Sequence, residues 1–248
     1  MEFLPALAVA FAGGILPAFI WLFFWLKEDE AHPEPNSLII LTFFLGMLAV
    51  PFAFVIQIFT EAVLIGNYTI QEVFVSNYIL AIVTIVIWAA AEEIVKYWAA
   101  HIGGLSRKAN DEPIDPIIYL ITAALGFAAL ENTLFLLNPL FSGESTVAFI
   151  TGNMRFIGAT LVHVGSSAII GIFISLSYYK NSFFKKRYLL SGFILSIALH
   201  SVFNSFIIKG GMKGAEGFTM LGFFLVWFSI IVVILAFEYV KHKVVKKN

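Results

Sequence analysis

The strongest constraint on the fold is a series of seven apolar segments, each long enough to cross a lipid bilayer as a helix. A bilayer core of about 30 Å requires about 20 apolar residues per helix. Hydrophobic residues make up 60% of the 248 residues and charged residues only 12%, a balance that a soluble core cannot bury. The sequence therefore predicts an all-α, polytopic transmembrane helix bundle. The seven segments are approximately 4–26, 37–60, 77–101, 114–137, 154–179, 188–208 and 217–240.

The connections between these segments are short and rich in polar residues, glycine and proline, as in 104–113 and 138–152. We see no soluble domain, low-complexity tail or fixed repeat, so residues 1–248 are expected to form a single integral membrane domain. The first segment lacks a basic region before it and a small-residue cleavage signature after it. We therefore expect a retained helix rather than a signal peptide.

The distribution of Lys and Arg predicts the orientation in the membrane. Three basic residues, Arg155, Lys209 and Lys213, lie on one predicted side. Eleven lie on the other, in the connections after segments one, three and five and in the C-terminal tail. The positive-inside rule then places the N-terminus outside and the C-terminus in the cytoplasm. The expected location is a bacterial or archaeal cytoplasmic membrane. The eleven are Lys27, Arg107, Lys108, Lys180, Lys185, Lys186, Arg187, Lys241, Lys243, Lys246 and Lys247.

Charge and cysteine content exclude several classes of function. The formal net charge is −1, without the basic excess that marks nucleic-acid binding, so nucleic acid is not an expected partner. The chain has no cysteine, which excludes disulfides, a thiol nucleophile and thiolate metal ligands. Any metal must therefore be held by His, Asp or Glu.

Ionisable residues inside hydrocarbon are costly and are by default candidates for a functional site. Segment three contains Glu92, Glu93 and Lys96, with the lysine one helical turn from both acids. Adjacent glutamates point about 100° apart on a helix, so one can face a water-filled cavity while the other pairs with Lys96. The alternative is an acid–base pair that only holds helices together.

Segment four contains Glu131 and Asn132 deep in the helix, with Asp115 near its cytoplasmic start. The two deeper residues are candidates for a functional site. Alternatively, they form an interhelical hydrogen-bond pair, a contact worth about 1 kcal/mol in membranes. Asp115 can equally be an interfacial residue.

Segments five and six each contain a histidine in the middle of the helix. Segment five has Arg155 at its outer end and His163 inside, and segment six has His200 and Asn204, which share a helix face at i, i+4 spacing. A single buried histidine is more often structural than a ligand. Here two histidines lie on successive spans, and the two spans before them contain buried acids. This arrangement favours a shared site.

The combined pattern resembles the PrsW family of bacterial membrane proteases, which is related to the CAAX-processing membrane endopeptidases. The resemblance covers segments three to six, residues 88–205. It is carried by Glu92-Glu93-x-x-Lys96, Phe127-x-x-x-Glu131-Asn132, His163, and His200-x-x-x-Asn204.

The resemblance implies an intramembrane endopeptidase that cuts a membrane-associated protein, with anti-sigma factors as one substrate class. It implies that the site residues are Glu92, Glu93, Glu131, His163, His200 and Asn204. The chain departs from the family pattern at Pro116, where we associate a glycine with the position after Asp115, and at Phe135, where we associate a tyrosine. Neither change removes a proposed catalytic group, but both leave the substrate open.

Peptide hydrolysis needs a nucleophilic water, a stabiliser for the oxyanion and a proton donor for the leaving amine. We expect Glu92 or Glu93 to act as the general base, with Lys96, Asp115, Phe127, Asn132 and Arg155 in supporting positions. In one route, His163, His200 and a glutamate, assigned to Glu93, hold Zn²⁺. In the other route no metal binds, and the histidines and Asn204 stabilise the oxyanion.

Two other hypotheses about the function stay open. A proton- or ion-coupled transporter also needs buried Glu, His and Lys. We see no inverted repeat, and the charged stretch 88–98 lacks the Gly or Pro that breaks transporter helices. A non-catalytic scaffold would need no convergence of these polar groups.

Overall fold

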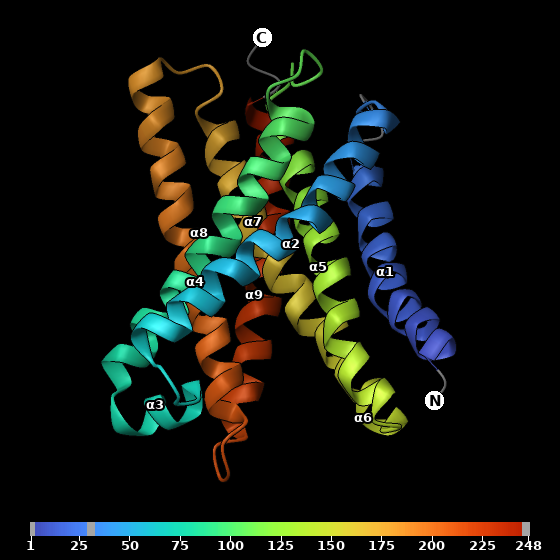
Figure 1. The fold of residues 1–248 in the computed structure, drawn as a ribbon. Coiled ribbons are helices and arrows are strands. Elements are labelled where there is room, and N and C mark those ends of the chain that lie inside the picture. Colours follow the sequence, from blue (N-terminus) through green and yellow to red (C-terminus); the bar gives the residue numbers. More distant parts are fainter. Residues whose placement is uncertain (1–2, 29–32, 245–248) are drawn as a thin grey trace.

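Within the residues that the structure describes, seven helices are long and apolar enough to cross a membrane (Figure 1). The structure is a computed structural model that describes residues 3–28 and 33–244, and this part of the chain contains no β-strand. The predicted all-α polytopic fold is therefore confirmed. Lys246 and Lys247, used above to predict the orientation, lie outside the described residues.

The described residues form nine α-helices, and three short π-helical turns extend or join them. The helices are α1 (Phe3–Glu28), α2 (Asn36–Leu64), α3 (Ile70–Ser76), α4 (Tyr78–Ala100), α5 (Asp115–Phe141), α6 (Ser145–Met154), α7 (Thr160–Leu176), α8 (Ser182–Gly210) and α9 (Gly217–Tyr239). The π-helical turns are η1 (His101–Leu105), η2 (Arg155–Ala159) and η3 (Val240–Val244). Helices α6 and α7 form one span through η2, and the start of α1 and the end of α9 lie at opposite ends of the bundle (Figure 1).

The fifth span begins nine residues before its predicted start. The predicted connection 138–152 shrinks to 142–144, because α5 continues through Pro139 to Phe141 and α6 starts at Ser145. Gly143, at φ +78°, makes the tight turn between them. Pro139 has no backbone N–H to offer the carbonyl of Phe135, so it weakens the last turn of α5, and the helix ends two residues later.

The sixth span also begins earlier than predicted. Asn181 caps α8 by accepting a hydrogen bond from the backbone N–H of Phe184. Lys185, Lys186 and Arg187 therefore lie in the first turns of α8 and not in a connection. The short helix α3 was not predicted.

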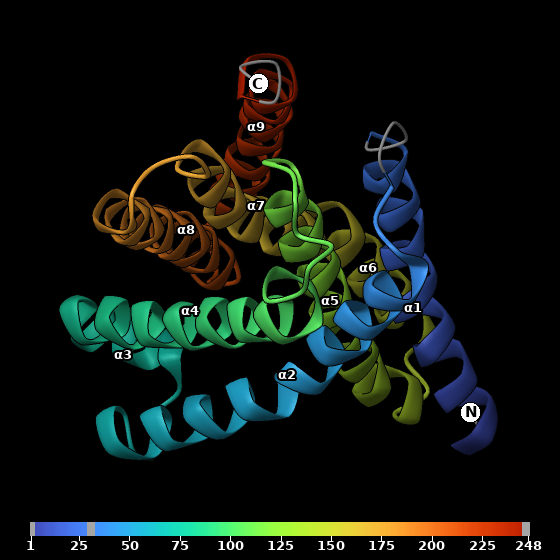
Figure 2. The ribbon, with the colours of Figure 1, turned by 90° about the horizontal axis from the view of Figure 1, so that it is seen from above.

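Helix α5 is the most buried span and lies in the middle of the bundle, with α1, α2, α4 and α7 around it (Figure 2). Helix α2 crosses it very closely. A Cβ on Gly126 of α5 would lie 1.9 Å from the backbone oxygen of Phe43, and one on Gly46 of α2 would lie 2.1 Å from that of Ala123. Small residues permit such backbone contact, which drives helix association in lipid.

The outer surface of the bundle is apolar, as a lipid-facing surface must be. Large side chains such as Phe52, Phe59, Phe149 and Phe224 are among the most exposed residues. Most of the buried polar residues are instead gathered inside, on α4, α5, α7 and α8.

Candidate active site

A cavity of about 460 Å³ opens among α2, α4, α5, α7, α8 and α9. It extends from the middle of the bundle toward the end where α3 and α6 lie, the lower end in Figure 1. Polar groups and large apolar side chains share its wall. The polar residues include Gln57, Glu92, Glu131, His163, His200 and Asn204, and the apolar ones include Phe54, Trp88, Phe203 and Phe223.

Three buried side chains in this wall form a potential metal-binding group. Glu92, His163 and His200 each offer a ligand atom, and these atoms lie within 4.8 Å of one another. Oε2 of Glu92 lies 3.6 Å from Nδ1 of His163 and 3.5 Å from Nε2 of His200. This oxygen is buried and has no hydrogen-bond partner among the described residues. An orphaned buried carboxylate oxygen facing two imidazoles fits a metal ion, which would supply the missing partner.

Glu93 points to the other side of α4 and does not line the cavity. Its Oε1 accepts hydrogen bonds from Nζ of Lys96 at 2.5 Å and from the hydroxyl of Ser166 at 2.8 Å, and Oε2 accepts one from Ser167 at 3.0 Å. The group that can hold a metal therefore differs from the predicted set at one position, since Glu92 takes the place given to Glu93. The rotation of α4 explains the difference, because adjacent residues point about 100° apart.

Each histidine is oriented by a second carboxylate. Nδ1 of His200 lies 2.7 Å from Oε1 of Glu93, and Nε2 of His163 lies 2.9 Å from Oε2 of Glu131. Because a carboxylate only accepts, these nitrogens carry the protons. The remaining ring nitrogens face Glu92, and Nδ1 of His163 also lies 3.2 Å from Nζ of Lys96, which must turn away from it when a metal binds. Outer carboxylates of this kind fix histidine ligands in metal sites.

Arg155, at the start of η2, closes one side of the cavity. Its Nη2 donates to Glu131, and its Nε donates to Oδ1 of Asn132 at 2.6 Å. Asn132 in turn donates to Thr160 at 2.9 Å, and the guanidinium lies 3.9 Å from the ring centre of Phe135. Arg155 thus compensates the charge of Glu131 and connects consecutive spans.

Lys96 is fully buried between Glu93 and His163. Its Nζ lies 3.2 Å from Nδ1 of His163 and 5.4 Å from the ring centre of Phe127, which itself packs on the His163 imidazole. The lysine therefore compensates the buried acids, and the ring of Phe127 adds a cation–π contact to its ammonium. Both residues lie beside the metal-binding group, as their motifs predict.

Asp115 is the one predicted supporting residue that neither lines the cavity nor contacts a residue of the site among the described groups. Its carboxylate accepts hydrogen bonds from the backbone N–H groups of Asp111 and Glu112 at 2.8 and 2.7 Å. Close by, the hydroxyl of Tyr119 donates to Glu34. Asp115 thus orders the connection before α5, at the opposite end of the bundle from the cavity.

Gln57 contributes to the site from segment two, which lies outside the segments that carry the family resemblance. Its Nε2 donates to Oε1 of Glu92 at 2.8 Å, which holds the carboxylate with Oε2 toward the histidines. Gln57 and Glu61 are one helical turn apart in an otherwise apolar segment, and both line the cavity. This spacing is the signal that could have identified them.

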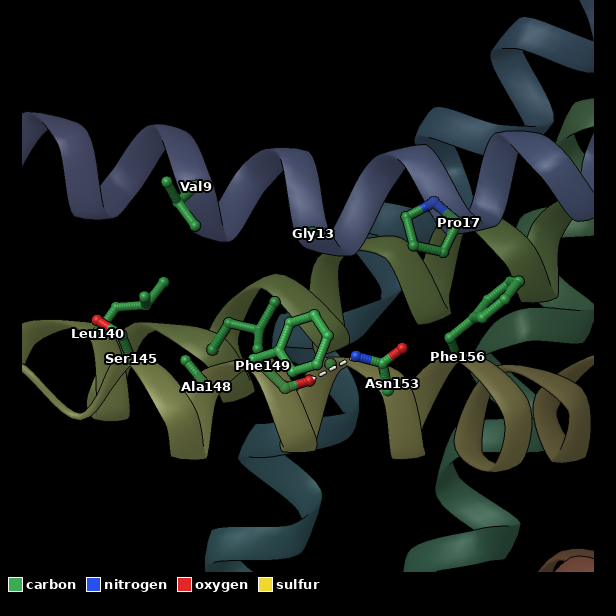
Figure 3. Close-up of a pocket in the computed structure, with 11 residues that line it drawn as sticks. Val9, Gly13, Pro17, Leu140, Ser145, Ala148, Phe149, Asn153 and Phe156 are labelled. Atoms are coloured by element: carbon green, nitrogen blue, oxygen red, sulfur yellow. Dashed lines mark hydrogen bonds between the residues drawn. The ribbon is translucent and has the colours of Figure 1, made fainter.

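A second cavity, of about 400 Å³, lies between α1 and the segment where α5 turns into α6 (Figure 3). Val9 and Pro17 of α1 face Phe149 and Phe156 across it (Figure 3). Asn153 has its amide satisfied by the backbone oxygen of Phe149 at 2.8 Å. Its lining residues include no acid, histidine or basic residue, so hydrolytic chemistry belongs to the first cavity.

Comparison with known proteins agrees with the resemblance inferred from the motifs. The model of the PrsW family intramembrane metalloproteases matches residues 34–236. Curated proteins named Protease PrsW are similar to the chain. The one from Geobacillus kaustophilus is 29% identical over 78% of this chain and 77% of its own. The one from Clostridioides difficile is 30% identical over 77% and 75%.

The relative from Halalkalibacterium halodurans is 25% identical and covers 87% of this chain and 91% of its own. No solved structure matches the chain significantly. These matches do not favour the transporter hypothesis, and they support a multi-pass protein of a bacterial cell membrane. The chain belongs to the PrsW family of intramembrane metalloproteases.

Proposed function

We propose that Glu92, His163 and His200 hold Zn²⁺ and that this centre hydrolyses a peptide bond within a membrane-spanning protein. The observation that carries the proposal is the position of Glu92 Oε2, which is buried, without a hydrogen-bond partner among the described residues, and within 3.6 Å of both histidines. Two histidines and a glutamate are a known catalytic zinc set. The chain has no cysteine, so the metal must be held by nitrogen and oxygen ligands, which zinc accepts.

When bound, zinc makes water nucleophilic near neutral pH and polarises the scissile carbonyl. The protein keeps the ligands in place through the outer carboxylates. Glu131 holds His163 and Glu93 holds His200, so each imidazole presents one unprotonated nitrogen toward Glu92. Gln57 orients Glu92 itself by donating to its other oxygen.

The remaining polar residues of the wall suit stabilisation of the oxyanion. Asn204 follows His200 by one helical turn and lines the same cavity, where its amide can donate a hydrogen bond. Arg155 adds a positive charge at the opposite wall, already oriented by Glu131 and Asn132. Donors fixed in a low-dielectric site stabilise developing charge strongly, because they need no reorganisation.

The cavity also suits an extended peptide better than an intact helix. A helical carbonyl is already hydrogen-bonded within its own helix and packed at its surface, so a substrate must unwind before water reaches it. Apolar side chains such as Phe54, Phe203 and Phe223 can receive the side chains of the unwound segment. A membrane-spanning anti-sigma factor, the substrate class that the family resemblance implies, meets this requirement.

The test uses purified protein in liposomes with a single-span anti-sigma factor as substrate. Cleavage should depend on one bound zinc per chain, cease after chelation and return when zinc is added. Glu92→Gln and His163→Ala should lose both zinc and cleavage. Glu144→Gln is the matched control, because Glu144 is an exposed residue of the α5–α6 turn. Undiminished cleavage by metal-free protein would refute the zinc assignment and leave the route in which a glutamate activates water directly.

A further inference from the structure

A third cavity, of about 280 Å³, lies at the end of the bundle opposite to the active site. It is formed where η1 ends, where α7 ends and where α8 begins. These three helix ends lie at one face of the bundle, near its upper end in Figure 1. The cavity is therefore at the depth where lipid head groups meet the protein.

The polar wall of this cavity is basic. Lys185 and Lys186 lie on the first turns of α8, and His101 begins η1. No acidic side chain is among its lining residues, although Asp111 and Glu112 belong to the adjacent connection. Basic pockets between spanning helices are typical sites for anionic lipid head groups.

Asn110 adds a second, independent indication of a ligand. Its Nδ2 donates to the backbone oxygen of Leu105 at 2.9 Å, which fixes the orientation of the amide. Oδ1 is buried and has no hydrogen-bond partner among the described residues, while Asn110 lines the cavity. A buried acceptor that is held in place without a donor indicates a ligand that donates a hydrogen bond to it.

Tyr178 is a further polar residue in the wall of this cavity. Its hydroxyl donates to the backbone oxygen of Asn110 at 3.2 Å, and burial raises the pKa of this tyrosine, so the hydroxyl stays protonated at neutral pH. Nζ of Lys185 lies 5.6 Å from the ring centre of Tyr178. Ile174 and Leu189 provide apolar wall on the side of α7 and α8.

We propose that this cavity binds the head group of phosphatidylglycerol from the surrounding membrane. Lys185 and Lys186 bind the phosphate, and a glycerol hydroxyl donates to Oδ1 of Asn110. The acyl chains run along Ile174 and Leu189. Phosphatidic acid lacks the glycerol head group and phosphatidylcholine lacks both the hydroxyl and the net negative charge, so neither satisfies the whole site.

The experiment measures displacement of a fluorescent phosphatidylglycerol from delipidated, full-length protein in detergent. Phosphatidylglycerol should compete best, ahead of phosphatidic acid and phosphatidylcholine. The Lys185→Gln/Lys186→Gln variant should bind it about 25-fold more weakly, at about fivefold per lysine. The matched control is Lys180→Gln/Arg187→Gln, which removes the same charge from residues that do not line the cavity and should change binding less than twofold.

Asn110→Leu should bring the affinity for phosphatidylglycerol down to that for phosphatidic acid. Asn110→Ala serves the same purpose if the leucine variant does not fold. If the control variant bound phosphatidylglycerol equally weakly, the loss would come from general surface charge, and the proposed site would be refuted. Equal binding of the two acidic lipids by the wild type would refute the glycerol contact. Soluble glycerophosphoglycerol binding as tightly as the lipid would refute a lipid ligand in favour of a free phosphate ester.

Discussion

Glu93 and His200 are joined across α4 and α8 by a 2.7 Å contact between the carboxylate Oε1 and the imidazole Nδ1. The same carboxylate binds Lys96, Ser166 and Ser167, so it is saturated with donors from three helices. Glu92, its neighbour in sequence, has one oxygen without a hydrogen-bond partner among the described residues. The two acids therefore have different tasks, and substitution can separate them.

Glu93→Gln should destabilise the protein as well as reduce its activity. The amide leaves the buried ammonium of Lys96 without a counter-charge, and breaking a buried pair costs about 3–5 kcal/mol. Glu92→Gln should abolish cleavage with little loss of stability, because no buried cation hydrogen-bonds to that residue among the described groups. Thermal unfolding in detergent and the cleavage assay test both. Equal stability of the two variants would contradict the division of tasks.

Gln57→Leu should weaken metal binding by about 10–100-fold without unfolding the bundle, the usual effect of losing a partner that orients a ligand. The reason is that Oε1 of Glu92 loses its donor and the carboxylate can rotate away from the histidines. Metal titration of the apo-protein is the appropriate measurement. Gln71→Leu, on the exposed surface of α3, should leave the affinity unchanged. A wild-type affinity in the Gln57 variant would mean that another contact orients Glu92.

Gly126→Ala should lower the stability by at least about 1–3 kcal/mol, the range for an overpacked core. The new Cβ would meet the backbone oxygen of Phe43 and not a movable side chain, so α2 and α5 would have to separate. Gly217→Ala is the control, because its Cβ would have no neighbour within 4 Å, and we expect a change below about 0.5 kcal/mol. Unfolding in detergent mixtures measures both. Similar stabilities would show that the crossing can relax.

The orientation predicted from the basic residues can be tested with single cysteines, because the chain contains none. A membrane-impermeant thiol reagent should label Lys213→Cys, between α8 and α9, in intact cells. It should label Lys108→Cys, between η1 and α5, only after the membrane is opened. The reverse labelling pattern would show that the bundle has the opposite orientation, with the active-site cavity toward the cytoplasm.

The number and type of the spans could be predicted from the sequence, because each apolar segment is long enough to cross the bilayer on its own. The exact ends of the spans could not be predicted, because local turns and caps set them. Gly143 allows α5 and α6 to approach within a three-residue turn, and Asn181 starts α8 before its basic residues. Such capping and turn effects are small beside the hydrophobic signal of a whole span.

The sequence predicts that the buried acids and histidines share one cavity, but it does not predict the geometry of that cavity. Buried acids and histidines on successive helices have few neighbours other than one another, so their approach around a cavity could be expected. Which of Glu92 and Glu93 faces the cavity depends on the rotation of α4 about its axis. Packing against α2 and α8 sets this rotation, and no local pattern encodes it. Gln57 was missed because one amide and one acid a helical turn apart are a weak signal near the end of an apolar segment.

The pairing of Glu131 with Arg155 also bears on how the chain enters the membrane. The two charges belong to consecutive spans joined by residues 142–144, so they can neutralise each other within one helical hairpin. A hairpin that carries an internal ion pair is far less costly to transfer from the translocation machinery into lipid than a helix with an isolated carboxylate. Helix α5 can therefore enter the membrane before the rest of the bundle has formed. The ion pair that holds the active-site wall together also makes this hairpin easier to insert during synthesis.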